Sequence, residues 1–499
     1  MPTAKCRVEA RVATSRAGAR EVLVGLKGAP KGRTPSASNL LGAMIVAFLV
    51  LVAQPAQAQR AELEKSIQRR VLDNGLEVIV VENHGVPLAT VEIDVKNGSY
   101  TQTPPYAGLA HMYEHMFFRA NQQYPAPGAF VDRASELGAV FNGTTSEERV
   151  DYYVTLPADS IAGGMRFLAA ALRHPLFLPG ELAREKEVVL GEYDRQEASP
   201  YFVLDQAMGQ KLWPGNFSRK NVIGDRTVVR NVTPDQMREI QRRYYIPNNS
   251  LLLVTGDVDP QEVFSLARTI YSDWPRGPDP FVADPIPPMP PLSGNQAVIA
   301  ETPVSAVTIE MQWQGPSVRA DAVSTYSADV FSDVLNQPGS GFQQRLVDSG
   351  LFQGVVVNYY TLDHVGPITI SGQTSPDKLA RAMAALDQEI SHFADPGYIT
   401  PEQLAQVKAQ RAVSTAFTTE RTTGYTHIIG FWWAVASLDY FMGYVDNMAT
   451  RTTTDLAAYA RRYIVGKPHV TGVLLSPADR QALNLTESAL IGGSTRASQ

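Results

Sequence analysis

The sequence predicts an α+β protein of two homologous domains, each an antiparallel-rich sheet with helices packed on one face. Strand-like and helical stretches alternate along the first half, and parts of that half recur in the second. β-Branched or alternating residues predict the strands, and helical periodicity with Pro or Gly at the edges predicts the helices. The expected strands are 76–83, 89–97, 151–157 and 250–258, and the expected helices are 160–174, 181–198 and 234–245.

The first two expected strands, 76–83 and 89–97, are separated by five residues. A connection this short is typical of an antiparallel hairpin, because parallel neighbours need a longer crossover. We therefore expect these two strands to pair with each other.

Two pairs of segments recur at nearly the same separation in the chain. RRYYIPNNSLLLVTGDVDP at 242–260 resembles RRYIVGKPHVTGVLLSPAD at 461–479. VEIDVKNGS at 91–99 resembles TIEMQWQGPS at 308–317, where Glu92 matches Glu310. The two shifts along the chain differ by a single position. Two matches at almost one offset indicate duplication of a single domain.

A proline-rich stretch at 276–292 separates the two halves and has neither helical nor strand periodicity. Such a composition is typical of an extended linker. The expected domain organisation is a signal peptide at 1–58, an N-terminal domain at 68–275, a linker at 276–296, a C-terminal domain at 297–486 and a tail at 487–499.

The segment 1–58 has the pattern of a secretory signal. A basic segment is followed by a short apolar run at 40–53 and by Ala56-Gln57-Ala58, a small-x-small cleavage site. An uncleaved anchor is the alternative, but the apolar run is short for a spanning helix. Cleavage would remove eight basic and two acidic side chains and change the formal net charge from −6 to −12.

Composition excludes several classes of protein. At 44% apolar and 19% charged residues, the 499-residue chain is not a disordered protein, and it contains no apolar run long enough for a polytopic membrane protein. An acidic mature chain is a poor candidate for binding nucleic acid or anionic lipid. The single cysteine, Cys6, would leave with the signal, and a cysteine-free mature chain suits an oxidising compartment such as a bacterial periplasm. We expect no stable membrane insertion after cleavage.

The motif H-x-x-E-H at residues 111–115 carries the candidate chemistry. On a helix, His111 and His115 are one turn apart and point the same way, so their neutral imidazoles can bind one Zn²⁺. Glu114 lies on that side as well, beside the metal. This is the reversed zincin arrangement, in which the glutamate is the catalytic acid and base. Two surface histidines with a solvated glutamate are the alternative, but the surrounding residues are apolar.

A catalytic zinc needs a third protein ligand and an open position for water. The helix expected at 181–198 offers Glu185 and Glu192, which are seven residues apart and therefore on one face. Both lie at the edge of an apolar stripe, where an unpaired carboxylate is costly. Spacing alone does not choose between them, and ion pairs with neighbouring arginines would explain either.

The sequence resembles the pitrilysin family of inverzincin peptidases, which includes mitochondrial processing peptidase and insulin-degrading enzyme. The resemblance covers about residues 68 to 485, nearly the whole mature chain. The motifs that carry it are HMYEH at 111–115, NGTTSEERVDYYVTLP at 142–157, EKEVVLGEYD at 185–194 and YYIPNNSLLLVTGDVDP at 244–260.

The resemblance implies roles for particular residues. It assigns Glu192 as the third zinc ligand, with His111 and His115, and Glu185 as the carboxylate that supports a ligand histidine. It implies a zinc endopeptidase, with one Zn²⁺ per chain, whose domains form half of a clamshell chamber.

The segment around the Asn-Gly pair has two interpretations. By itself, Asn-Gly between apolar residues is a hairpin-turn signal. The resemblance instead implies an edge strand in which Asn142, Gly143 and Thr144 bind the substrate backbone. Gly143 replaces the family's usual alanine and is expected to loosen that edge slightly.

The second half departs from the family in two ways. The shift that carries Glu92 to Glu310 also carries His111, Glu114 and His115 to Asp329, Ser332 and Asp333, so no zinc is expected there. Family members also have an arginine and a tyrosine, seven residues apart, that hold the substrate carbonyl; the matching positions here are Leu346 and Gln353, with Arg345 one place off. We therefore expect a heterodimer whose zinc-less homologous subunit supplies that pair.

Three functional hypotheses remain after the sequence is read. The first is a periplasmic zinc endopeptidase that degrades peptides, the second a non-catalytic scaffold of the same fold, and the third a processing peptidase with one preferred cleavage site. The aromatic stretch 425–444 is expected to form core helices, the alternative being an exposed partner surface around Trp432 and Trp433. Histidines outside the motif, including His364 and His427, are expected to be structural.

Overall fold

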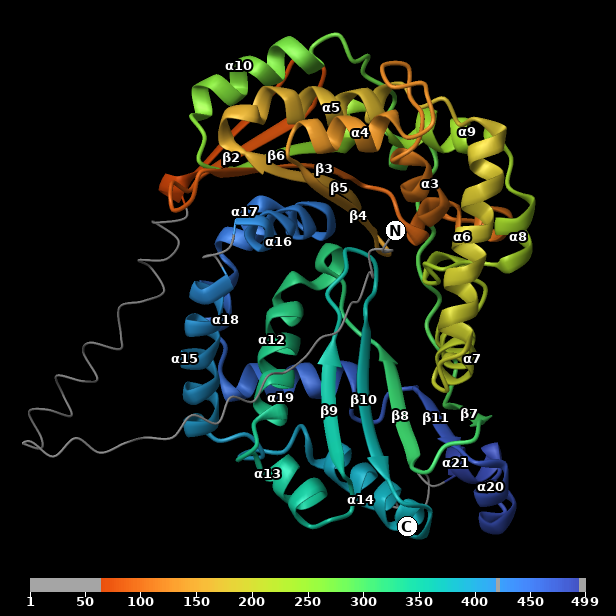
Figure 1. Ribbon diagram of the computed structural model, residues 1–499. Coiled ribbons are helices and arrows are strands. Elements are labelled where there is room, and N and C mark those ends of the chain that lie inside the picture. The colour runs from red at the N-terminus through yellow and green to blue at the C-terminus, as the bar shows by residue number, and fades with distance from the viewer. Residues whose placement is uncertain (1–63, 419–421, 493–499) are drawn as a thin grey trace, which may run out of the picture. The chain divides into compact units, whose positions relative to one another are not determined.

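The computed structural model describes residues 64–418 and 422–492, and these residues carry two β-sheets (Figure 1). The predicted signal peptide at 1–58 lies outside the described residues, as does the end of the predicted tail from residue 493. Among the described helices, none is both long enough and apolar enough to cross a membrane.

The first sheet has six strands in the spatial order β1-β2-β6-β3-β5-β4. Only the pair β2–β6 is parallel. The strands are β1 (Ile67–Val71), β2 (Glu77–Glu82), β3 (Leu88–Val95), β4 (Val140–Thr145), β5 (Val150–Pro157) and β6 (Ser250–Gly256).

The second sheet has five strands in the order β7-β11-β8-β10-β9, and only β7–β11 is parallel. This order repeats that of β2, β6, β3, β5 and β4 in the first sheet. The register repeats as well. Glu77 pairs with Leu251 in the first sheet, and Gln296 pairs with Val470 in the second. The shift along the chain from Glu77 to Gln296 equals the shift from Leu251 to Val470. The strands are β7 (Gln296–Glu301), β8 (Val307–Gln314), β9 (Gly354–Tyr359), β10 (Pro367–Thr374) and β11 (Val470–Leu475).

The predicted hairpin between the first two expected strands is wrong. Strand β6 lies between β2 and β3, parallel to β2 and antiparallel to β3. All seven residues of β6 are buried, which suits a central position in the sheet. The short connection between β2 and β3 therefore joins two strands that are not neighbours.

Helices cover both halves. Those of the first half are α3 (Leu109–Phe117), α4 (Ala129–Glu136), α5 (Ile161–Arg173), α6 (Pro179–Glu197), α7 (Phe202–Leu212), α8 (Arg226–Asn231), α9 (Pro234–Tyr244), α10 (Pro260–Tyr271) and the short α11 (Pro280–Ala283) in the predicted linker. Those of the second half are α12 (Val318–Asn336), α13 (Gly341–Gln343), α14 (Leu379–His392), α15 (Pro401–Thr418), α16 (Thr422–Val435), α17 (Leu438–Met442), α18 (Tyr444–Ala449), α19 (Thr453–Tyr463), α20 (Pro477–Leu483) and α21 (Glu487–Gly492).

The two faces of the first sheet are covered by different parts of the chain. Helices α5 and α10 pack on one face, where Val78, Val80 and Val91 join the core of the first half (Figure 1). Helix α16 of the second half packs against β3 and β6 on the other face. That face is apolar at β2 and β6, which contribute Ile79 and Leu253 to the second half's core.

The aromatic stretch 425–444 is a core element, as expected. It forms α16, α17 and the start of α18. Trp432 and Trp433 are 9% and 7% exposed, and the Trp433 indole nitrogen donates to a Glu77 carboxylate oxygen at 3.0 Å. These aromatic side chains therefore join the two halves and do not form an exposed surface.

Close packing of α16 on β3 depends on Gly430. A Cβ atom at this position would lie 2.4 Å from Oδ1 of Asp94, whose carboxylate is fully buried. Replacing Gly430 by Val is expected to destabilise the protein by about 1–3 kcal/mol, because the overpacked helix must move off the sheet. Thermal and urea unfolding measure this effect.

Gly180→Ala, at a helical position with nothing within 4 Å of the added Cβ, is the matched control. It is expected to leave stability unchanged or to raise it by about 0.4–1 kcal/mol. A Gly430→Val protein as stable as this control would contradict the packing argument.

Candidate metal centre and active site

Helix α3 is fixed at its first turn by a side chain. The Oε1 atom of Gln102 accepts hydrogen bonds from the backbone N–H groups of Gly108 and Ala110, both at 3.0 Å. Gly108 adopts a φ of 92°, which favours glycine, and a Cβ there would lie 2.8 Å from the Ile223 carbonyl oxygen. The buried Leu109, Met112, Tyr113 and Met116 anchor the helix in the core of the first half.

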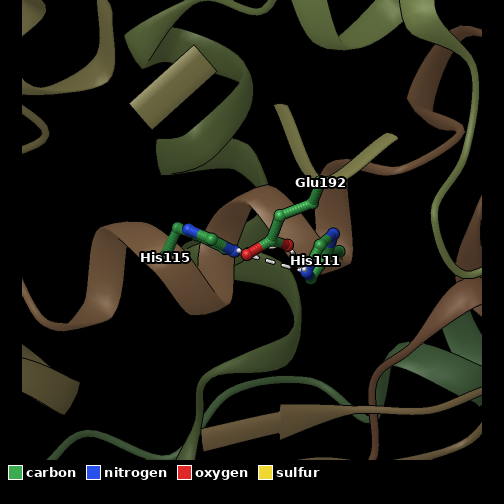
Figure 2. A group of neighbouring side chains, drawn as sticks. All are labelled: His111, His115 and Glu192. Carbon is green, nitrogen blue, oxygen red and sulfur yellow. Dashed lines mark hydrogen bonds and ion pairs between the residues drawn. The ribbon is translucent and has the colours of Figure 1, made fainter. Parts of the chain in front are cut away.

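The other face of α3 points toward α6 and carries the two histidines of the motif (Figure 2). The Nε2 atoms of His111 and His115 are 3.3 Å apart. Oε2 of Glu192, on α6, lies 3.4 Å from the first and 3.5 Å from the second. Two nitrogens and one oxygen from two helices thus converge on one point.

This spacing fits a tetrahedral metal ion. Zinc bonds of about 2.1 Å at tetrahedral angles place neighbouring ligand atoms about 3.4 Å apart. The three observed separations, 3.3 to 3.5 Å, match that edge length and are long for hydrogen bonds. Imidazole nitrogen and carboxylate oxygen are also donors that zinc prefers. The site therefore fits zinc, with a fourth position left for water.

Glu185 lies on the other side of the His115 ring. Its Oε2 atom is 3.4 Å from His115 Nδ1, and its Oε1 atom is 2.9 Å from Arg119 Nη2. Burial by itself raises the pKa of Glu185, but His115 and Arg119 outweigh it and hold the pKa below its ordinary value. The structure thus places Glu192 beside the Nε2 atoms of His111 and His115, and Glu185 beside Nδ1 of His115. Spacing alone left open which of the two glutamates lies at the candidate metal site.

The protonation of the two histidines differs in the metal-free protein. Burial, together with the neighbouring His115, lowers the pKa of His111 to about 4. Burial alone would also lower the pKa of His115, but the nearby carboxylates of Glu185 and Glu192 raise it to about 9. In the metal-free protein His111 is therefore neutral, whereas His115 is protonated and must release a proton to bind a metal.

Glu114 points to the sheet and not to the other two carboxylates. Its Oε2 atom accepts a hydrogen bond of 2.6 Å from the Thr145 hydroxyl at the end of β4. Burial raises the pKa of Glu114 to about 7, although the Thr145 bond favours the charged form. A carboxyl group that titrates near neutrality suits a general base. No sequence motif singles out Thr145, although strand alternation places its side chain on the face of Gly143.

The three predicted substrate-binding residues lie on β4, the edge strand of the first sheet. The Asn-Gly pair lies inside the strand, so the hairpin-turn interpretation is wrong. Asn142 and Thr144 are exposed on one face, whereas Gly143 is buried on the other. A Cβ at Gly143 would lie 3.2 Å from Glu114 Cγ and 3.1 Å from a Phe118 ring carbon, so a side chain here would press on Glu114 of the motif.

In the second half, the helix pair that corresponds to α3 and α6 carries an aspartate–arginine ion pair. Helix α12 follows β8 as α3 follows β3, and α15 packs on α12 as α6 packs on α3. Asp333 on α12 is bound by Arg411 of α15, with Oδ2 at 2.8 Å from Nε. Asp329 accepts a hydrogen bond of 2.6 Å from the Tyr444 hydroxyl. An arginine thus provides the positive charge between these two helices.

The positions expected for the substrate-holding arginine and tyrosine offer neither group. Leu346 is fully buried, and Gln353 has no phenol. The neighbouring Arg345 is bound to Glu389, with Nη2 at 2.8 Å from Oε2. The Tyr398 hydroxyl donates to the same carboxylate at 2.6 Å. Arg345 is therefore engaged within its own half.

A second group of possible ligands, Glu92, Asp151 and His427, fails the test that the first group passes. His427 Nδ1 lies 2.5 Å from Glu92 Oε2 and 3.9 Å from Asp151 Oδ2, so neither separation matches the edge of a tetrahedral site. Arg149 Nη2 also lies 2.7 Å from Asp151 Oδ1 and supplies a positive charge beside this carboxylate.

Comparisons with known proteins agree with this fold. Residues 77–224 match the family described as Insulinase (Peptidase family M16), and residues 231–411 match the family described as Peptidase M16 inactive domain. The chain belongs to the M16 peptidase family, and the predicted family resemblance is confirmed. The inactive-domain match includes Asp329 and Asp333, which replace the histidines in the second half.

Relatives by sequence include a mitochondrial subunit and bacterial proteins. The chain is 26% identical to the mitochondrial-processing peptidase subunit beta of Blastocladiella emersonii over 41% of its own length and 44% of that protein, so it matches less than half of this relative. It is 22% identical to the uncharacterized zinc protease YmxG of Bacillus subtilis over 71% of its length and 85% of that protein. It is 23% identical to the zinc protease PqqE of Helicobacter pylori over 89% and 99%.

Solved structures share the fold. A protease from Helicobacter pylori superposes with a TM-score of 0.74 at 20% identity, over 82% of this chain and 99% of that one. The periplasmic protease PqqL from Escherichia coli gives a TM-score of 0.72 at 18% identity, over 87% of this chain and 50% of that one. At these identities the likeness establishes the two-domain architecture.

Replacing Thr145 by Val in the metal-free protein is expected to raise the pKa of Glu114 above about 7. The lost hydrogen bond favours the charged carboxylate, so its removal favours the protonated form. The pH dependence of the Glu114 carboxyl ¹³C shift measures this change. Thr144→Val, on the exposed face of β4, is the control and should leave the titration unchanged. Identical curves for wild type and Thr145→Val would contradict the assigned contact.

Proposed function

We propose that this chain is a zinc-dependent endopeptidase that hydrolyses peptides or unfolded segments, and that it is the metal-bearing subunit of a heterodimer. The observation that carries the proposal is the tetrahedral spacing of His111, His115 and Glu192, with Glu114 as a nearby carboxylate outside the ligand set. Relatives named zinc proteases support this assignment.

In the proposed hydrolysis, some residues of the chain bind the ion and another transfers the proton. His111, His115 and Glu192 would hold the ion. A bound zinc ion acts as a Lewis acid and lowers the pKa of a coordinated water toward neutrality. Glu114 takes the proton from the attacking water and passes it to the leaving amine, so no covalent intermediate is needed. Thr145 holds the Glu114 carboxylate at the end of β4.

Peptide binding at the open edge of β4 explains how a substrate reaches this centre. Residues 140–145 pair with β5 on one side only, and no other described strand covers the second side. An extended peptide can add to such an edge through main-chain hydrogen bonds. Those bonds give affinity with modest sequence preference, which suits an enzyme for varied peptides. Asn142, Gly143 and Thr144 supply this contact.

The proposed location is the periplasm. The signal pattern at 1–58 supports export, and one structural neighbour, PqqL of Escherichia coli, is described as a periplasmic protease. The proposed domain limits are those expected from the sequence, with the zinc-binding domain at 68–275 and the C-terminal domain at 297–486.

Metal content and turnover together test the proposed chemistry. Glu114→Gln is expected to keep about one zinc per chain and to lose about 10²- to 10⁴-fold in turnover, because only the proton transfer is removed. Glu192→Gln is expected to lose the metal itself. Elemental analysis and peptide digestion measure the two effects.

Glu187→Gln, exposed on the same helix, is the control. A metal-free wild type that added zinc does not activate would refute the assignment and favour a scaffold.

A missing substrate-holding pair predicts dependence on a partner. Because Leu346 is buried and Arg345 is bound to Glu389, we expect the purified chain to digest peptides poorly alone. Mixing with a zinc-less homologous subunit that carries the arginine and tyrosine should restore digestion, measured with unfolded peptides of varied sequence. Full activity of the chain by itself would contradict the heterodimer.

A further inference from the structure

The turn that follows the substrate strand is held by the second half of the chain. It comprises Ser146–Arg149 and connects β4 to β5. Glu148, 1% exposed, accepts hydrogen bonds from the backbone N–H groups of Asp363 at 2.7 Å and His364 at 2.8 Å. The His364 ring nitrogen Nδ1 lies 3.1 Å from the same carboxylate. One buried acid thus binds the segment between β9 and β10.

The next residue makes a second attachment. Arg149 donates through Nη1 to the His427 carbonyl oxygen on α16 at 2.9 Å. The same guanidinium holds the sheet, with Nη1 at 3.2 Å from Asp94 and Nη2 at 2.7 Å from Asp151. Asp151 faces Thr144 across the β4–β5 ladder. Arg149 therefore ties α16 to the strand that aligns the substrate edge.

The two attachments lie close in sequence to the residue that binds Glu114 of the motif. Thr145, which binds Glu114, is three residues before Glu148. Bonds from N–H groups to a buried carboxylate are short and strong, so they restrain the backbone that carries them. An edge strand has a partner on one side only, and the turn supplies the restraint that its open side lacks.

We infer that Glu148 and Arg149 are positioning residues through which the metal-less half of the chain fixes the substrate strand β4 and the Thr145–Glu114 contact. This inference deepens the proposed function and rests on it. The second half then acts on the reaction from a distance, although none of its described residues belongs to the group of His111, His115 and Glu192.

The variant Glu148→Gln tests the inference with little change of shape. Its amide group would face one of the two N–H donors, so one attachment is lost. Amide hydrogen exchange in residues 140–145 is expected to become faster, and kcat/KM for peptides, assayed with the partner subunit if one is required, is expected to fall about 10- to 100-fold. Bound zinc should remain at about one per chain.

Trp433→Phe is the matched control. It removes another hydrogen bond between the halves, from the indole to Glu77 on β2, well away from β4 in the sheet order. Both variants should lower the melting temperature, but only Glu148→Gln should loosen β4 and reduce kcat/KM. Equal effects on β4 exchange, or unchanged exchange in Glu148→Gln, would overturn the inference.

A second variant and the exchange measurement still test the inference if Glu148→Gln does not fold or no peptide is cleaved. If Glu148→Gln does not fold, His364→Phe removes only the imidazole from Glu148 and should give the same changes at smaller size. If the wild type cleaves no peptide with any partner, the proposed function fails, but the exchange comparison still decides whether the second half holds β4.

Discussion

Three donor atoms must lie within about 3.5 Å of one another for this chain to bind a tetrahedral ion, and two helices from distant parts of the sequence must be fixed to achieve this. His115 and Glu192 are on α3 and α6, which touch each other but are not consecutive. Gln102 fixes the start of α3, and Glu185 ties His115 to α6 through the outer ring nitrogen. The position of β4 matters as well, because its Thr145 holds Glu114, the carboxylate of the motif that lies outside the candidate ligand set.

Duplication shows what happens to this helix pair when the metal ligands are absent. The strand order and register repeat, so the second half places α12 and α15 as the first half places α3 and α6. Asp329 and Asp333 both lie on α12, and Arg411 of α15 provides a cation beside them from within the chain. The second half thus carries an ion pair between these helices, where the first half carries the candidate metal site.

Local patterns predicted the motif but not its surroundings. Helical periodicity placed His111 and His115 on one face, and the expected helix 181–198 corresponds to α6 at Pro179–Glu197. The same periodicity put Glu185 and Glu192 on one side, so only the packing of α6 against α3 distinguishes them. The predicted hairpin failed because β6, which separates β2 from β3, comes from residues 250–256, far along the chain. Pairing across such a separation leaves no local signal in the sequence.

The inter-half contacts explain why an open edge can remain ordered beside a reactive centre. Adding a peptide strand requires that the N–H and C=O groups of β4 already be aligned, because ordering them on binding would cost affinity. Covering the free edge with another strand would align them but would also block the substrate. Holding the turn at its end avoids this conflict, since Glu148 reaches Asp363 and His364, far along the chain, and leaves the edge itself clear. The second half is therefore connected to the edge strand beside the candidate site through backbone hydrogen bonds.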